Sequence, residues 1–462
     1  MINYFNFGRF DDRYLITNDL GYYMFIDDMQ FRKLLFDRIT IDDERYSEFT
    51  EKGFIYNGNK DVFAEKYRYT MGDSKNYLFC STSLHIFVVT NACNFNCVYC
   101  QAQSNTQKKR GMMSTETAKK AVDIALSSNS ENLTFEFQGG EPLINFDVIK
   151  FIVTYSEENC SGKNIEYNLV SNLTLLNDEM LDFFKEHHVM ISTSIDGDRD
   201  VHNSNRPYLA GKGTFDDVVD KLKTVQSAEL SSGAIQTTTR YSLSHYKEII
   251  DTYISLGMTN VFIRPLTPLG FAHESWEKIG YTDGEFLDFY EKCLFYLLEV
   301  NKSGTYCSEG HSSIFLRKIL DRYPPNYMEL RSPCGAGIGQ IAYYFDGKVF
   351  TCDEARMLYE MGSDAFMLGT VDNTYNELID NPVCKATAAA STLETIPGCC
   401  DCVYQPYCGT CPILNYAFDN NIFPHKPNDY KCGMYKGMLE VIFGILKKAD
   451  ETELSILKSW IN

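Results

Sequence analysis

Three closely spaced cysteines carry the most specific chemistry in this sequence. Cys93, Cys97 and Cys100 form a C-x3-C-x2-C run, and it directly follows the apolar stretch 84–90, which predicts a buried strand. Three thiolates on one short loop can hold three irons of a [4Fe–4S] cube and leave the fourth iron free for a small ligand. A zinc loop lacking one ligand is the alternative, although such zinc sites favour paired C-x2-C knuckles. The spacing therefore favours an iron–sulfur centre that binds a ligand.

The cysteine run, with the aromatic Tyr99 before its last cysteine, resembles the signature of the radical S-adenosylmethionine (SAM) family. The resemblance implies that Cys93, Cys97 and Cys100 bind a [4Fe–4S] cluster and that its open iron binds SAM. It also implies a reaction: one electron cleaves SAM to methionine and a 5′-deoxyadenosyl radical, which abstracts hydrogen from the substrate. Tyr99 is then expected to lie beside the bound SAM.

Length and composition limit the class of protein. At 462 residues with 44% hydrophobic residues, the chain is long enough for two or three globular domains. No apolar run reaches the length of a membrane span, and residues 1–13 lack the apolar core of a signal peptide. We therefore expect a cytoplasmic protein without a membrane partner, in which the 16 cysteines bind metal instead of forming disulfides. The net charge of −19 argues against nucleic acid as a partner; it would favour a basic peptide, or simply keep the surface solvated.

The middle of the chain repeats a strand–helix unit. The apolar patterns predict strands at 84–90, 133–138, 165–170, 190–195, 235–241 and 261–265. They predict intervening helices at 114–127, 146–157, 178–187, 216–228 and 245–256. Ser114 and Asn177 stand at expected N-caps, and Gly257 stands where a helix commonly ends. Six such units predict an α/β fold, a partial (β/α)6 barrel, with its chemistry at the carboxyl ends of the strands.

Polar residues follow several of these strands, where a ligand would bind. Gly139-Gly140-Glu141-Pro142 resembles the GGEP motif of the family, which meets the amino group of SAM. The stretch after the fourth strand, with Ser194, Asp196, His202 and Arg206, resembles the segment that touches the ribose and carboxylate of SAM. The resemblance implies SAM contacts from Tyr99, Gly139, Gly140, Glu141, Ser171, Asn172, Ser194 and Arg206. Asp196 can equally form only the turn, and each polar strand end has a simpler role as a helix cap or loop bond.

A second group of cysteines occupies the C-terminal third. Its members are Cys334, Cys352, Cys399, Cys402, Cys408, Cys411 and Cys432, with four residues between Gly347 and Cys352. This arrangement resembles the SPASM extension, which holds two auxiliary [4Fe–4S] clusters, for three clusters in all. Cys408 and Cys411 depart from that pattern because two residues, not three, separate them.

The resemblance divides these cysteines into two ligand sets. One set is Cys399, Cys402, Cys408 and Cys432; the other is Cys334, Cys352 and Cys411. The fourth ligand of the second set stays open between Cys307, Cys384 and an iron free to take a substrate. A zinc site on the two C-x2-C pairs is the alternative.

Two other features bear on mechanism. Asp346-Gly347 predicts a β-hairpin turn that brings Cys334 and Cys352 to neighbouring ends. Asp353 directly follows Cys352, and in sulfatase-maturing members of the family an acid at this position takes a proton from the substrate. Asp353 is therefore a candidate catalytic base, with a turn-capping aspartate as the alternative.

We expect three domains: residues 1–80, a radical SAM barrel at 81–305 and a SPASM domain at 306–462. Residues 14–25 predict two strands around a turn, and a helix follows from Met29. This layout is similar to that of small domains that bind leader peptides by strand addition; the alternative is a structural cap on the barrel. Tyr14, Asn18 and the 407–412 stretch resemble one branch in particular, the B-type radical SAM maturases of His-Xaa-Ser systems.

The resemblance implies a peptide maturase that forms a crosslink or an oxidation in a ribosomally made peptide. Its implied partners are that peptide with or without a leader, a ferredoxin- or flavodoxin-like electron donor, and a second radical SAM maturase. A sulfatase-maturase-like enzyme that makes formylglycine is the alternative with the same chemistry. A non-catalytic iron–sulfur electron carrier or scaffold is the alternative of another class.

Overall fold

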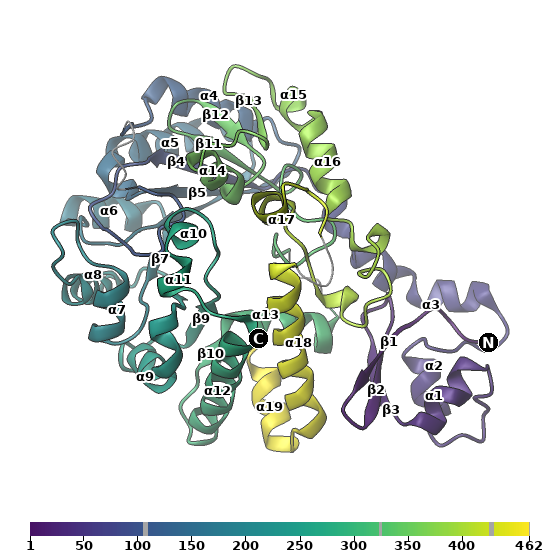
Figure 1. Ribbon diagram of the computed structural model, residues 1–462. Helices are drawn as coiled ribbons and strands as arrows, with labels where there is room; N and C mark the ends of the chain where they lie inside the picture. The colour runs from purple at the N-terminus through teal and green to yellow at the C-terminus, as the bar shows by residue number, and fades with distance from the viewer. Residues whose placement is uncertain (105–109, 323–325, 425–428, 462) are drawn as a thin grey trace.

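The computed structural model describes residues 1–104, 110–322, 326–424 and 429–461. The N-terminal region is a three-stranded antiparallel sheet, ordered β1-β2-β3, with three helices. It lies to one side of the rest of the molecule (Figure 1). Its elements are β1 (Asn6–Phe10), β2 (Arg13–Thr17), β3 (Tyr23–Ile26), α1 (Asp28–Leu35), α2 (Tyr46–Glu51), α3 (Lys60–Asp73) and the short η1 (Asn76–Leu78). The predicted β2–β3 hairpin and the helix after it are thus present, whereas the sequence pattern did not predict β1.

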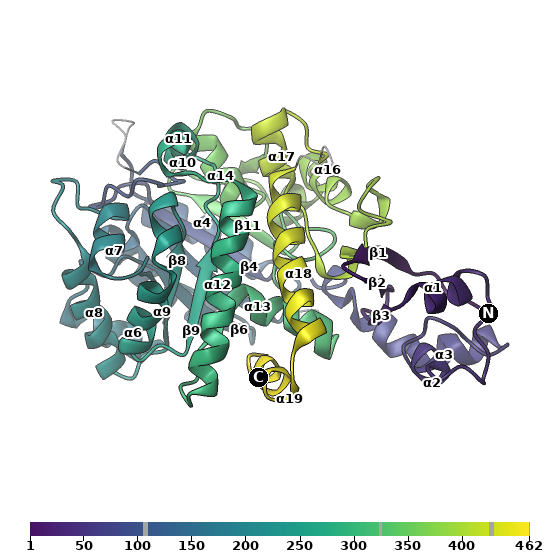
Figure 2. The same ribbon diagram turned by 60° about the horizontal axis from the view of Figure 1, so that its bottom comes forward.

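One large sheet forms the centre of the molecule. Its strands are β4 (Leu84–Thr90), β5 (Asn132–Gly139), β6 (Asn164–Val170), β7 (Met190–Ser194), β8 (Ser232–Thr237), β9 (Asn260–Arg264) and β10 (Ser308–Glu309). These strands are parallel to one another, in the order β10-β9-β8-β7-β6-β5-β4. The sheet curves so that helices cover its outer side (Figures 1 and 2). The predicted α/β class with a parallel sheet is therefore confirmed.

The helices that connect the strands include the five predicted ones, each within two residues of its predicted bounds; the helix directly after β7 and the helices between β9 and β10 were not predicted. They are α4 (Thr115–Leu126), α5 (Phe146–Asn159), α6 (Asp178–Glu186), α7 (Arg199–Asn205), α8 (Phe215–Ser227), α9 (Tyr246–Ser255), α10 (Phe271–Glu274), α11 (Trp276–Ile279) and α12 (Asp283–Lys302). Ser114 caps α4 by accepting from the Thr117 amide, and Asn177 caps α6 in the same way. Gly257 has a φ of +72° just after α9, a conformation that favours glycine.

The fifth strand of the barrel lies earlier in the chain than its sequence pattern indicates. The pattern predicts a strand at 235–241, whereas β8 spans Ser232–Thr237. The strand stops early because Thr239 and Ser242 form a capping box for the short helical turn Arg240–Ser244, which withdraws this backbone from the sheet.

The C-terminal region continues the central sheet. Its elements are α13 (Gly310–Leu316), β11 (Gln340–Tyr344), β12 (Lys348–Phe350), α14 (Asp353–Glu360), β13 (Met367–Thr370), α15 (Tyr375–Ile379), α16 (Pro382–Ala390), α17 (Pro412–Asp419), α18 (Tyr430–Lys448) and α19 (Glu451–Ser459). β11 pairs in parallel with β4, and β11 and β12 form the predicted hairpin, with Gly347 at a φ of +88°. The cysteine-rich region is thereby joined edge to edge to the strand that precedes the first cysteine loop.

The apolar core follows this arrangement. Strand β4 is buried along its length, with Phe87, Val88 and Val89 at 0% exposure, as expected for a central parallel strand covered on both faces. In the described part of the chain no helix is both long and apolar enough to cross a membrane. The predicted boundaries between the three domains stay predictions.

Candidate functional site

The loop with the first three cysteines follows β4 and is fixed by backbone hydrogen bonds to two other segments. The Asn96 amide donates to the Pro207 carbonyl (2.8 Å), and the Val98 amide donates to the Asn205 carbonyl (2.9 Å). The Cys100 carbonyl accepts from the Phe271 amide at 3.0 Å. Because both flanks of the loop are tied to the barrel, the positions of its thiols are set by the fold.

The thiols of this loop are electrostatic neighbours. Burial raises the pKa of Cys93 well above its usual value, and the Cys97 thiolate, Glu141 and the Cys100 thiolate raise it further. Burial also raises the pKa of Cys97 to about 12, against the effect of the Arg206 guanidinium. Three adjacent thiolates would repel one another strongly here, and a multivalent metal centre removes that penalty. The donor set therefore fits an iron–sulfur cluster.

A buried chain of polar side chains lies beside this loop. The Arg206 Nη1 donates to the Tyr99 hydroxyl at 2.7 Å, and that hydroxyl donates to Asp196 at 2.8 Å. Asp196 is completely buried, and burial raises its pKa. The Arg206 Nε is buried without a hydrogen-bond partner among the described residues. A guanidinium with a free donor beside Cys97 suits a site that binds a negatively charged ligand.

The predicted GGEP loop packs tightly on the cysteine loop. A Cβ on Gly140 would lie 2.3 Å from the Ala92 carbonyl oxygen, and a Cβ on Gly139 would lie 2.5 Å from that of Thr90. The Gly140 amide donates to the Thr90 carbonyl at 2.9 Å. The two glycines are therefore needed for close backbone contact, whether or not they also approach a ligand.

Glu141 joins the ends of two strands. Its carboxylate is completely buried and accepts from the Leu143 amide (3.0 Å), the Ser171 hydroxyl (2.8 Å) and the Asn172 amide (2.8 Å). These bonds oppose the rise in the pKa of Glu141 that burial causes. Among the predicted SAM contacts, Glu141, Ser171 and Asn172 thus form one hydrogen-bonded unit. Asn172 extends it to the cysteine loop by donating to Asn94 at 2.8 Å.

Ser194 differs from the other predicted contacts. It lies at the end of β7 and is half-buried, and its hydroxyl forms no hydrogen bond with any other residue that the structure describes. It is therefore free to bind a ligand at the carboxyl ends of the strands.

The barrel interior contains a cavity of about 390 Å³ that Asp353 enters from α14. Arg356, whose side chain is 2% exposed, forms an ion pair with Asp353, and its Nη2 donates to Gln138 at 3.5 Å. Gln138 directly precedes the GGEP loop. Glu136 also lines the cavity; burial raises its pKa and the nearby Asp353 raises it further. The structure thus places the predicted catalytic base in the barrel, held by arginine instead of capping a turn.

Cys334, Cys352 and Cys411 form a second group of neighbouring thiols. All three are buried, with 5%, 2% and 9% exposure, and burial raises the pKa of each. Cys352 and Cys411 stand at the N-terminal ends of α14 and α17, where the helix dipole favours negative charge. This donor set also fits an iron–sulfur cluster.

Glu354 is a member of this second site that the sequence interpretation missed. Its carboxylate raises the pKa of all three thiols after the larger effect of burial. Its proximity to Cys352 could have been read from the Cys352-Asp353-Glu354 order. Its proximity to the distant Cys334 and Cys411 depends on the tertiary fold.

The other predicted cluster cysteines lie in the C-terminal region. Cys399 and Cys408 pack in one small cluster, and Cys432 lies in the first turn of α18. Of the two candidate fourth ligands, Cys384 lies against the loop after Cys334, because its Sγ would be 2.6 Å from a Cβ on Gly337. Cys307 is buried beside β10, near Glu309. Among the described residues, no group of three or more histidine, cysteine, aspartate and glutamate side chains is arranged to hold a single metal ion.

Comparison with known proteins identifies the central domain. Residues 87–251 match the model of the Radical SAM superfamily. An uncharacterized protein of Methanocaldococcus jannaschii is 33% identical over 183 residues, which cover 40% of this chain and 62% of that protein. A cysteine-type anaerobic sulfatase-maturating enzyme of Clostridium novyi is 24% identical over 371 residues, which cover 78% of this chain and 95% of that enzyme. The chain thus spans less than two thirds of the first relative and nearly all of the second.

Two solved structures share the fold. Native anSMEcpe with bound AdoMet aligns with a TM-score of 0.68 and 20% identity over 79% of this chain and 98% of that chain. Streptococcus suis SuiB bound to precursor peptide SuiA aligns with a TM-score of 0.56 and 12% identity over 92% of this chain and 99% of that chain. This protein therefore contains a radical SAM domain in a radical SAM fold, followed by a cysteine-rich C-terminal region. Radical SAM proteins bind SAM and a [4Fe–4S] cluster.

Proposed function

We propose that this protein is a radical SAM maturase that modifies a ribosomally made peptide. The observation that carries the proposal is the thiol group of Cys93, Cys97 and Cys100, fixed at the end of β4 beside the Arg206 cation. These three cysteines would bind the [4Fe–4S] cluster. When bound, cluster and SAM supply a carbon radical that abstracts hydrogen and starts a crosslink or an oxidation.

The residues of the chain position the reactants around that chemistry. The Glu141 unit holds the ends of β5 and β6 against the cysteine loop. Arg206 and Ser194 offer donors at the carboxyl ends of the strands, where SAM would bind. The cavity of about 390 Å³ in the barrel would hold the reacting part of the peptide away from water. Asp353, at its wall, would accept the proton that the substrate loses on oxidation.

Two further clusters would lie in the C-terminal region. Cys334, Cys352 and Cys411 would hold one, with Glu354 or Cys384 in contact with it. Cys399, Cys402, Cys408 and Cys432 would hold the other. These clusters would carry electrons between a ferredoxin- or flavodoxin-like donor, the substrate and the SAM site.

The N-terminal sheet offers an edge for a peptide strand. In the described residues β1 pairs only with β2, so its other edge is open to strand addition. The opposite edge is occupied, because the β3 carbonyls of Tyr23 and Phe25 accept hydrogen bonds from Lys52 and Arg45. A leader peptide, or a second radical SAM maturase that presents the substrate, would dock on the β1 side. The SuiB structure was solved with a precursor peptide, which supports a peptide substrate for this fold.

The proposal is tested with anaerobically reconstituted enzyme, SAM, a reductant and the peptides encoded beside the gene. We expect a SAM-dependent loss of two hydrogens from one of these peptides by mass spectrometry, and none with Cys97→Ala. Cleavage of SAM without any change in these peptides would contradict the peptide assignment.

A sulfatase-maturase-like reaction is the second candidate. The placement of Asp353 directly after Cys352, within the barrel cavity, and the similarity to a sulfatase-maturating enzyme favour it. Conversion of a cysteine or serine in a sulfatase-derived peptide to formylglycine would support this reaction. A protein that binds iron and sulfide but never cleaves SAM would instead be an electron carrier.

A further inference from the structure

A second cavity, of about 240 Å³, lies between the N-terminal region and the cysteine-rich region. One wall is the β2–β3 turn at residues 19–21, and the next is the segment 71–77 at the end of α3. The opposite walls come from residues 318–322, 330–332 and 394–408. Cys408, a predicted cluster ligand, is among the lining residues. The cavity therefore joins the region proposed to receive a peptide to the region proposed to hold a cluster.

Its lining has an excess of positive charge in a strongly acidic chain. The cations are Lys75, Lys318, Arg322 and Arg331, and the carboxylates are Asp19 and Glu394. Lys75 is paired with Glu394 at 2.6 Å. Among the described residues no carboxylate lies within ion-pair distance of the other three cations. Lys318 and Arg331 also lie near the thiols of Cys408 and Cys334, whereas Arg322 has no carboxylate partner among the described residues. A cavity with this excess of cationic donors suits a negatively charged group.

Two of these cations are themselves buried. Arg331 is 3% exposed, and its Nε and Nη2 have no hydrogen-bond partner in the described residues. Lys318 is 8% exposed and donates to the Leu330 carbonyl. Arg322, by contrast, is exposed and lies with its Cζ 4.4 Å from the centre of the Tyr22 ring.

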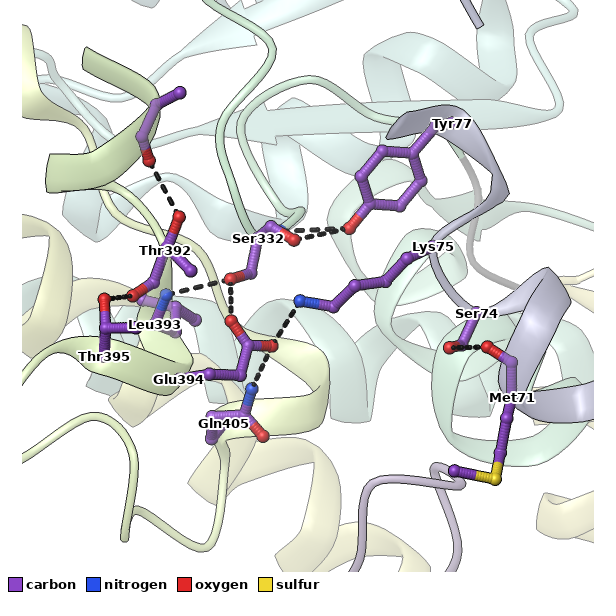
Figure 3. A network of polar contacts seen from close by, with 11 residues as sticks. Met71, Ser74, Lys75, Tyr77, Ser332, Thr392, Leu393, Glu394, Thr395 and Gln405 are labelled. Carbon is purple, nitrogen blue, oxygen red and sulfur yellow. Dashed lines mark hydrogen bonds and ion pairs between the residues drawn. The ribbon is translucent and has the colours of Figure 1, made fainter. Parts of the chain in front are cut away.

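The walls are held in place by one carboxylate that is fully engaged (Figure 3). Glu394 accepts from Lys75 (2.6 Å), the Ser332 hydroxyl (2.6 Å) and Gln405 (2.9 Å), which come from three separate segments. Tyr77 donates to the Ser332 carbonyl at 2.8 Å. Because these donors come from separate segments, they hold the walls together and the cavity is formed before a ligand arrives.

We propose that this cavity binds an acidic side chain of the peptide substrate, whose carboxylate pairs with Lys318, Arg322 and Arg331. The volume suits one side chain and not a nucleotide-sized cofactor. The net charge of −19 repels an acidic peptide over most of the surface, so this cavity would set where such a peptide docks. The assignment rests on the proposed function, because it takes the ligand to be a peptide.

The test measures binding to the full-length protein by fluorescence anisotropy, without SAM or reductant. The probes are two fluorescein-labelled hexapeptides, Gly-Gly-Glu-Glu-Gly-Gly and the same peptide with glutamine for glutamate. We expect the glutamate probe to bind at least about tenfold more tightly, the usual effect of one charge-assisted contact. Arg322→Gln should weaken the glutamate probe by about tenfold and leave the glutamine probe unchanged. Arg68→Gln, an exposed arginine on α3, is the matched control and should change neither.

Equal affinity of the two probes for the unsubstituted protein would overturn the assignment. So would an Arg322→Gln protein that keeps the preference for glutamate. If inorganic phosphate displaces both probes and glutamate gives no advantage, the cavity is a phosphate site and the assignment is wrong. Because turnover is not measured, a glutamate preference without any modified peptide would overturn the proposed function alone.

Discussion

Cys93, Cys97 and Cys100 lie beside a guanidinium, whereas Cys334, Cys352 and Cys411 lie beside a carboxylate. In the first group Arg206 lowers the pKa of Cys97 against the effect of burial. In the second group Glu354 adds to the effect of burial at all three thiols. The two groups have the same number of thiols, but the first is half-buried and the second is buried. Each group has charges of both signs nearby, because Glu141 raises the pKa of Cys93 while Arg331 and Lys431 lower those of Cys334 and Cys411. The groups differ in the dominant charge, which is the Arg206 cation at Cys97 and the Glu354 carboxylate in the second group.

This difference has a physical consequence for any cluster bound there. A buried cation stabilises the added negative charge of a reduced cluster and raises its reduction potential, and a buried carboxylate lowers it unless it ligates iron. The comparison therefore predicts that the group beside Arg206 accepts an electron more readily than the group beside Glu354. The predictions that follow test this contrast.

The largest effect should come from removing one thiol of each group. Cys97→Ala and Cys352→Ala should each lower the iron content by about four atoms, the content of one cube. Only Cys97→Ala should also abolish SAM cleavage, because only the first group is proposed to bind SAM. Iron analysis and chromatography of the nucleoside product would check this, with Cys160→Ala, outside both groups, as the control. Loss of SAM cleavage in Cys352→Ala with full iron content would contradict the division of roles.

Arg206→Gln should destabilise the first group. The substitution leaves the buried Asp196 carboxylate without the nearby cation and removes the donor to Tyr99. Losing the donor to Tyr99 and the cation near the buried Asp196 carboxylate should cost about 1–3 kcal/mol, and the free energy of unfolding from urea denaturation would show it. Arg206→Lys, which keeps the charge, should lose less. Equal stability of Arg206→Gln and the unsubstituted protein would show that the cation is not needed there.

Glu354→Gln should act on the second group alone. Removing the carboxylate should raise the reduction potential of a cluster at Cys334, Cys352 and Cys411 by on the order of 60 mV, a tenfold change for one electron. Redox titration followed by electron paramagnetic resonance would measure it. Glu136→Gln, a carboxylate in the same cavity, is the matched control. A changed spectrum with lost iron would instead identify Glu354 as a cluster ligand.

The smallest expected effect is on how the stability of the fold depends on pH. It concerns folding and not the chemistry of the clusters. Burial lowers the pKa of His202, next to Asp196, to about 3. A depressed histidine pKa stabilises the fold above the unfolded value of about 6.5, and this stability is lost as pH falls, by about 1.4 kcal/mol per unit. Urea midpoints at pH 7, 6 and 5 should fall less steeply in His202→Gln. The exposed His188→Asn serves as the control, and an unchanged slope in His202→Gln would contradict the assignment.

Local signals allowed much of the barrel to be predicted from sequence. The bounds of β4 match the apolar stretch 84–90, and Ser114 and Gly347 mark a helix start and a hairpin as expected. These features depend on near neighbours in the chain, and the residue types report them directly. The pairing of β11 with β4 was not predicted, because nothing local to either strand specifies a partner about 250 residues away.

In the candidate site, too, some features could be predicted from local sequence and others could not. The cysteines were found by spacing, and the fold brings each predicted triad together as electrostatic neighbours. The partners of Glu141 and the position of Glu354 were missed, because they depend on which strand ends and helix starts meet in space. A sequence pattern can name a donor, but the tertiary fold decides what faces it.

Release of 5′-deoxyadenosine from SAM tests the central claim most directly. The anaerobically reconstituted protein, given SAM and a reductant, should release the nucleoside, and the protein with Cys93, Cys97 and Cys100 all changed to alanine should release none. Nucleoside release that survives this triple substitution would contradict the account, as would its absence from an unsubstituted protein carrying its full complement of iron.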